Sequence, residues 1–140
     1  MRDKAFIDTN IFIYLQSTSE DDKRLASKRA INSFRCVCST QVLSETSNVL
    51  SKKAKMSFDQ VAEIIDGMVQ TCELIVVSYE TIQKAIEIAR DNMLGYYDSL
   101  IIASAIEAGC KYLLSEDLTD GQKIYNKITI INIYKHPEML

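Results

Sequence analysis

Short apolar runs alternate with longer helical patterns along the whole chain, and this alternation restricts the possible fold more than any other feature of the sequence. Five runs have the length and residue types of buried strands, at residues 5–7, 36–38, 74–77, 112–114 and 128–131. Runs of this kind that are separated by helices are typical of parallel sheets covered on both faces. The pattern therefore predicts a three-layer α/β/α fold with a central parallel sheet of four to five strands.

Helical periodicity and capping residues predict the segments between these strands. The expected helices are a segment at 11–15, a helix over about 21–34, one capped by Ser39 or Thr40, one from Ser57 to about Thr71 and one capped by Ser78. A further helix is expected to open at Asp98 and Ser99 and to end at Gly109. It is apolar nearly all round, which indicates a helix packed against the sheet.

The size and composition of the chain favour a single unit, residues 1–140. No stretch approaches the roughly 20 apolar residues that a membrane-spanning helix needs. The four cysteines form no CxxC pair and the only histidine is His136, so a zinc site is not expected. We expect a reduced, cytoplasmic protein.

The net charge of −3 is unusual for a protein that binds nucleic acid, but the charge is unevenly distributed. Residues 1–55 hold ten Lys or Arg and six Asp or Glu, a balance of +4, whereas residues 56–140 hold six and thirteen, a balance of −7. Runs of basic residues, such as those within residues 1–55, are more often solvated helix faces than binding surfaces. If they bind RNA, the contacts to its backbone are expected from Lys23, Arg24, Lys28, Lys52 and Lys53.

Acidic residues follow two of the predicted strands. Asp8 comes directly after the first strand, and Asp117 lies three residues after Leu114. Because open parallel sheets place ligand sites beyond the carboxyl ends of their strands, both side chains should project into one crevice. Two other acids belong to the same set: Glu45, early in a helix that follows a strand, and Asp98, at the start of the apolar helix.

Each of these acids also has a purely structural interpretation. Asp8 and Asp98 could be helix caps, Glu45 could be an exposed helical residue, and Asp117 could belong to a polar turn. Four carboxylates in one crevice would repel one another unless a cation lay among them. Oxygen ligands without a nearby His or Cys suit a hard cation such as Mg²⁺ or Mn²⁺, and phosphoryl transfer by metal-activated water is the chemistry to expect.

The segments that carry these acids resemble the PIN-domain family, and within it the VapC-like toxin ribonucleases. The matching segments are residues 6–10 (Phe-Ile-Asp-Thr-Asn), 39–45 (Ser-Thr-Gln-Val-Leu-Ser-Glu), 97–105 (Tyr-Asp-Ser-Leu-Ile-Ile-Ala-Ser-Ala) and 114–118 (Leu-Ser-Glu-Asp-Leu). They follow the order and the intervals of the family, and the resemblance covers almost the whole chain.

The resemblance implies a divalent-metal-dependent ribonuclease that is the toxin of a toxin–antitoxin pair. It implies Asp8, Glu45, Asp98 and Asp117 as metal-binding and catalytic residues, with RNA as substrate, a cognate antitoxin as partner, and a homodimer. Thr9 and Asn10 would orient Asp8 from the second layer of the site, and Ser115 would be the second-layer hydroxyl two residues before Asp117. Glu116 and Asp120 are further acids to which the resemblance gives no role.

Other classes of protein also place an Asp after the first strand. A haloacid-dehalogenase-type enzyme would need a second Asp two residues later, where this chain has Asn10. A receiver domain would need paired acids and a lysine after a late strand, and neither is evident. A non-catalytic PIN-like module that binds RNA or protein stays as the alternative, although such a module has no reason to keep four carboxylates.

Overall fold

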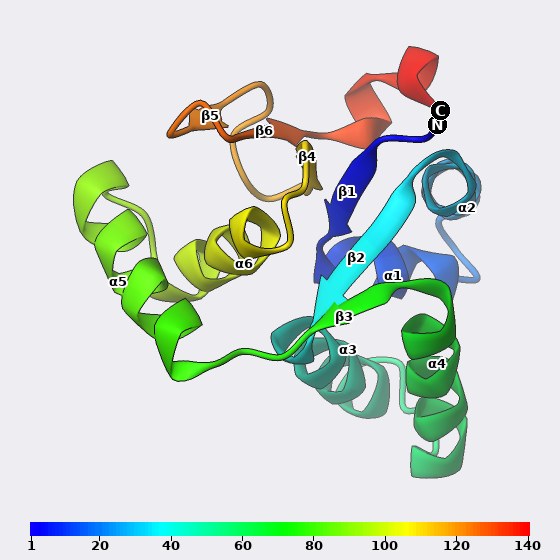
Figure 1. The fold of residues 1–140 in the computed structure, drawn as a ribbon. Coiled ribbons are helices and arrows are strands. Elements are labelled where there is room, and N and C mark those ends of the chain that lie inside the picture. Colours follow the sequence, from blue (N-terminus) through cyan, green and yellow to red (C-terminus); the bar gives the residue numbers. More distant parts are fainter.

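The computed structural model describes all residues, 1–140, and its centre is a single sheet in the strand order β3-β2-β1-β4-β6-β5 (Figure 1). The strands are β1 (Lys4–Ile7), β2 (Arg35–Ser39), β3 (Glu73–Ile75), β4 (Tyr112–Leu114), β5 (Lys123–Ile124) and β6 (Ile128–Ile131). All neighbours pair in parallel except β5 and β6, which are antiparallel. The predicted parallel sheet is confirmed, with β5 as an additional strand.

Six helices cover this sheet. They are α1 (Thr9–Leu15), α2 (Asp21–Ser33), α3 (Thr40–Lys52), α4 (Phe58–Thr71), α5 (Tyr79–Asn92) and α6 (Tyr96–Glu107). The chain ends in two short 3₁₀ helices, η1 (Ile133–Lys135) and η2 (Pro137–Met139). Helices α5 and α6 pack against each other, away from the group formed by α1 to α4 (Figure 1). Both groups contact the sheet, so the predicted three-layer architecture is confirmed. None of the helices combines the length and the hydrophobicity needed to cross a bilayer.

Local side-chain contacts fix where the helices begin. The Ser39 hydroxyl accepts a hydrogen bond from the Val42 amide at the start of α3. Helix α4 opens with a reciprocal capping box between Ser57 and Gln60, and α5 opens with one between Ser78 and Thr81. These bonds satisfy amides that lack a partner in the first helical turn. They explain why these starts could be predicted from sequence.

Helix α6 begins earlier than predicted. Its N-cap is Gly95, and Asp98 is the third residue of the helix. The interpretation of Asp98 as a cap is therefore wrong, because the cap position lies three residues before it. The rest of the prediction for α6 is confirmed, since residues 99–105 are all buried and the helix contacts β2 and β4.

Strand β5 was missed because two residues are too few for any periodicity. It joins β6 through a turn in which Tyr125 and Asn126 both have positive φ, 53° and 55°. Two consecutive positive φ values are the signature of a type I′ hairpin turn, but that turn usually contains Asn-Gly or Asp-Gly. The pair Tyr-Asn gave no such signal.

The chain crosses over β1 in the middle of the sheet. Connections run outward from β1 to β2 and β3 on one side, and then from β4 to β6 on the other. The carboxyl ends of β1 and β4 therefore lie at the topological switch point, where open α/β sheets leave a crevice. The amide of Asp8 donates to the carbonyl oxygen of Leu114 (3.1 Å), which joins the two strand ends directly.

We expect Ile102→Ala to lower the free energy of unfolding by about 2–5 kcal/mol, because its side chain is fully buried between α6 and the sheet. Ile86→Ala is the matched control, since Ile86 lies on α5 with 55% of its surface exposed. Urea unfolding followed by circular dichroism measures both. Equal losses in the two variants would contradict the assignment of α6 as the central buried helix.

Candidate metal centre

A cavity of about 280 Å³ lies at the carboxyl ends of β1 and β4. All four predicted acids line it: Asp8 from the end of β1, Glu45 from α3, Asp98 from α6 and Asp117 from the loop after β4. No lysine, arginine or histidine lines the cavity, and none of the four carboxylates takes part in an ion pair. The fold thus gathers acids from four distant segments without supplying a protein cation to balance them.

Asp8 is the most enclosed of the four acids. One carboxylate oxygen accepts from the Thr9 amide (2.7 Å), so Asp8 is the N-cap of α1, and the other accepts from the Ser115 hydroxyl (2.8 Å). Both the capping role and the position in the crevice were predicted, and both are present. Ser115 is itself buried and follows β4, so this bond ties the end of β1 to the loop that carries Asp117.

The side chains of Thr9 and Asn10, which were expected to orient Asp8, hold two other acids. The Thr9 hydroxyl donates to Glu45 (2.8 Å), and the Asn10 side-chain amide donates to Asp117 (2.6 Å). Each bond uses one carboxylate oxygen and leaves the other available to a ligand. The first turn of α1 therefore contacts Asp8, Glu45 and Asp117.

Asp98 stands apart from this network at the start of α6. Its carboxylate lies close to Gly95, at the positive end of the helix dipole. Asp98 and Asp117 are exposed, whereas Asp8 and Glu45 are half-buried. The acids thus extend from the interior of the sheet edge to solvent, where a large substrate could reach them.

The electrostatics of the site disfavour its charged state. Burial raises the pKa of Asp8 to about 6, against the lowering effect of hydrogen bonds from Ser115 and Thr9; the charges of Glu45 and Asp117 raise it further. Burial and the charge of Asp117 also raise the pKa of Asp98. Repulsion between the carboxylates and the loss of hydration both raise these pKa values. A bound cation would act in the opposite direction, because it favours the charged carboxylates.

The donor set fits a hard divalent cation in its chemistry. All the acidic ligands are carboxylate oxygens, which Mg²⁺ and Mn²⁺ prefer. No three His, Cys, Asp or Glu side chains in the structure are gathered tightly enough to hold an ion as they stand. The fit therefore rests on the identity, location and missing counter-charge of the donors, and not on a preformed coordination geometry.

The two acids without an assigned role are engaged elsewhere. Glu116 points away from the cavity and accepts from Lys23 and from the Tyr14 hydroxyl, both at 2.6 Å. Asp120 accepts from the Asn132 amide and contacts His136, both at 2.8 Å. Both carboxylates are engaged by these partners, and neither lines the cavity.

The basic residues suggested for RNA lie in different settings. Lys23 is paired with Glu116 and stacks over the rings of Tyr14 and Tyr134, while Arg24 pairs with Asp21. Lys28, Lys52 and Lys53 are exposed. Their contact with RNA stays a prediction, and Lys23 is the member of the set whose ammonium group is most fully occupied within the protein.

Sequence reasoning missed four residues of the cavity wall, the polar Asn48 and Tyr97 and the apolar Val49 and Ile101. Asn48 follows Glu45 by three residues on α3, and Tyr97 precedes Asp98 on α6. Helical spacing placed Asn48 on the same face as Glu45, and that signal was available in the sequence. The four cysteines are free and buried.

The fold and the acidic crevice define a class of α/β protein whose site lies at the switch point of a parallel sheet. The model of the PIN domain matches residues 5–119, and the chain belongs to the PIN-domain family. No curated protein sequence matches the chain at a significant level.

Solved structures share the fold at low sequence identity. A toxin–antitoxin complex from Klebsiella pneumoniae contains a chain with a TM-score of 0.69 and 20% identity, over 93% of this chain and 98% of that one. VapBC2 from Rickettsia felis, bound to a DNA fragment from its promoter, contains a chain with a TM-score of 0.66 and 20% identity, over 92% of this chain and 99% of that one. VapC20 from Mycobacterium tuberculosis, a toxin that cleaves the sarcin–ricin loop, has a TM-score of 0.65 and 18% identity, over 81% of this chain and 91% of that one.

The raised pKa of Asp8 predicts a pH-dependent stability without metal. The folded state binds the Asp8 proton more tightly than the unfolded chain does. The stability that this proton contributes is therefore full below about pH 4 and is lost as the pH rises through about 6. Asp8→Asn removes the titration but can still cap α1. The free energy of unfolding of the variant, minus that of the parent, should therefore increase by about 1–3 kcal/mol from pH 4 to pH 7.5.

Urea unfolding in EDTA at the two pH values measures this difference. Asp66→Asn is the control, because Asp66 is exposed on α4 and lies outside the cavity. A gain for Asp8→Asn that is the same at both pH values would show that Asp8 titrates normally in the folded chain.

Proposed function

We propose that this chain is a divalent-metal-dependent endoribonuclease, and that it is the toxin of a toxin–antitoxin pair. One observation carries the proposal: four carboxylates from separate segments line a single cavity that contains no protein cation. Membership of the PIN-domain family supports the same activity. The cavity reaches solvent at Asp98 and Asp117, so RNA could enter it, and a cation held by the acids would attract the phosphodiester.

The proposal assigns Mg²⁺ or Mn²⁺ to Asp8, Glu45, Asp98 and Asp117. When bound, such an ion supplies activation of water and neutralisation of charge at the phosphate. Ser115 and Thr9 would keep Asp8 and Glu45 oriented, and Asn10 would do the same for Asp117. These bonds limit the rotation of carboxylates that must present particular oxygens to a ligand.

A proton acceptor is also available in the cavity. Glu45 and Asp117 each keep one oxygen that no protein donor occupies in the bonds from Thr9 and Asn10. Either oxygen could receive the proton of the attacking water. Glu45 lies deeper and is fixed on helix α3, whereas Asp117 lies on an exposed loop.

An antitoxin partner and a homodimer belong to the same proposal. Their support comes from the solved relatives, which include a toxin–antitoxin complex and VapBC assemblies bound to DNA from Rickettsia felis and Salmonella typhimurium. The expected mass of the isolated protein in solution is then twice that of the 15.9 kDa chain. Size-exclusion chromatography with light scattering measures it, and a monomer at all concentrations would contradict the homodimer.

We expect Asp8→Asn and Asp98→Asn to reduce RNA cleavage by more than about a hundredfold, since losing a ligand should cost at least as much as losing a second-layer partner. Both variants should keep the circular dichroism spectrum of the parent. Cleavage of labelled RNA with Mg²⁺ or Mn²⁺ is the measurement, and Asp66→Asn is the matched control outside the cavity.

The same assay tests the alternatives. Cleavage by the parent that persists in EDTA would rule out the metal mechanism. Retention of RNA by the parent without cleavage under any metal condition would favour the non-catalytic module instead.

A further inference from the structure

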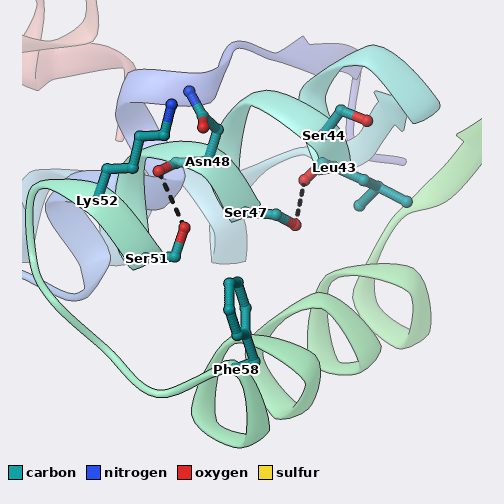
Figure 2. A pocket seen from close by; sticks show the side chains of 7 residues that line it. All are labelled: Leu43, Ser44, Ser47, Asn48, Ser51, Lys52 and Phe58. Carbon is teal, nitrogen blue, oxygen red and sulfur yellow. Dashed lines mark hydrogen bonds between the residues drawn. The ribbon is translucent and has the colours of Figure 1, made fainter.

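A second cavity, of about 550 Å³, lies between α3 and α4 on the side of the molecule next to the metal centre. Its walls are Leu43, Ser44, Ser47, Asn48, Ser51, Lys52 and Phe58. Figure 2 shows the Phe58 ring rising from α4 toward Ser47 and Ser51 on α3. None of the four acids of the metal centre lines this groove.

Phe58 is the only apolar side chain of these walls that is exposed, with 79% of its surface exposed. It is the first residue of α4 and lies between Ser57 and Gln60, the two residues of the capping box. The box fixes the backbone that carries the ring. A single exposed aromatic side chain is ordinary on a protein surface, so the ring alone indicates no ligand. Its neighbours supply the further observations.

The groove is continuous with the metal centre. Asn48 lines both cavities. Glu45, Asn48 and Lys52 follow one another at intervals of three and four residues, so they share one face of α3. At 1.5 Å per residue, the helix carries the wall from Glu45 to Lys52 over about 10 Å. This distance is on the scale of a few nucleotides.

The sign of the charge changes along this path. The metal centre is lined by four acids, whereas the groove contains Lys52 and no acidic residue. Lys53 and Lys55 add two positive charges in the connection between α3 and α4, and Asp59, beyond Phe58, does not line the groove. In Figure 2, Lys52 and Asn48 point to one side of α3, and Ser47, Ser51 and Phe58 lie on the other. A polyanion that extends from the metal centre along α3 would meet Lys52, which forms no ion pair within the protein.

The serine hydroxyls add polar contacts to the groove. Ser47 donates to the Leu43 carbonyl oxygen (2.7 Å), and Ser51 donates to that of Asn48 (3.2 Å). Both hydroxyl oxygens keep lone pairs that can accept a hydrogen bond. Nucleotides present such donors on their bases and on the ribose 2′-hydroxyl.

We propose that this groove binds a nucleotide of the single-stranded RNA substrate next to the cleavage point, with its base stacked on Phe58 and a flanking phosphate held by Lys52. The proposal rests on the ribonuclease function proposed above. Exposed aromatic rings combined with a basic track are the usual means by which proteins hold single-stranded nucleic acid without reading its sequence.

The test measures RNA binding separately from cleavage. Asp8→Asn is used as the background with Mg²⁺, and a short fluorescein-labelled single-stranded RNA of mixed sequence is titrated by anisotropy. Phe58→Ala should weaken binding by about tenfold, and Phe58→Tyr should restore it, because stacking needs only an aromatic face. Tyr79→Ala, on an exposed aromatic of α5, is the matched control and should bind as the background does.

Lys52 is tested through its salt dependence. Lys52→Ala should reduce the slope of log affinity against log salt by about one, whereas Phe58→Ala should leave that slope unchanged. Lys127→Ala, an exposed lysine in the turn between β5 and β6, is the control. In cleavage assays with Asp8 intact, the Phe58 and Lys52 variants should show a higher KM and a similar kcat.

Three results would overturn the proposal. If Phe58→Ala and Lys52→Ala bind and cleave RNA as well as the parent does, the ribonuclease function stands and only the groove proposal is removed. Loss of a copurifying protein from Phe58→Ala with unchanged RNA binding would assign the groove to a protein partner. Absence of both RNA binding and cleavage in the parent would remove the groove proposal together with the function.

Discussion

The site depends on keeping like charges close together at one edge of a parallel sheet. Asp8 ends β1 beside the carboxyl end of β4, and the crossover of the chain places the other acids around the same crevice. Three polar side chains make this arrangement possible: Ser115, Thr9 and Asn10 each donate to one carboxylate. Their dipoles reduce the repulsion without cancelling the charge, so the demand for a cation remains.

The contrast between paired and unpaired acids separates structural from functional carboxylates. Glu116 and Asp120 lie in the same stretch of chain as Asp117, but Glu116 pairs with Lys23 and Asp120 contacts His136. These two acids anchor the loop after β4 to α2 and to the C-terminal segment. Asp117, between them, is left without a cation and faces the cavity. The loop is thus held by its neighbours while the acid that could serve the chemistry stays free.

Helix α3 connects the acidic centre with the proposed RNA groove. Its first turn starts at the sheet edge, and the face that carries Glu45 continues through Asn48 to Lys52. Glu45 of the proposed metal centre and Lys52 of the proposed groove would then be held at a fixed spacing by one helix, while Phe58 and the other three acids come from other segments. Sites built on helices hold their geometry better than sites built on loops, because helical hydrogen bonds fix the spacing of the side chains.

The sequence by itself determined the five main strands, the three layers and the four acids at the sheet edge. These features follow from local signals: apolar runs, capping serines, and acids placed directly after strands. Strand β5 and the true start of α6 at Gly95 were decided by pairing and packing that a short, irregular segment does not announce. Tertiary structure alone decided which acids are neutralised, since Lys23 lies 93 residues from Glu116. It also decided that Phe58 faces α3 across a groove, because the packing of one segment on another determines which side chains stay exposed.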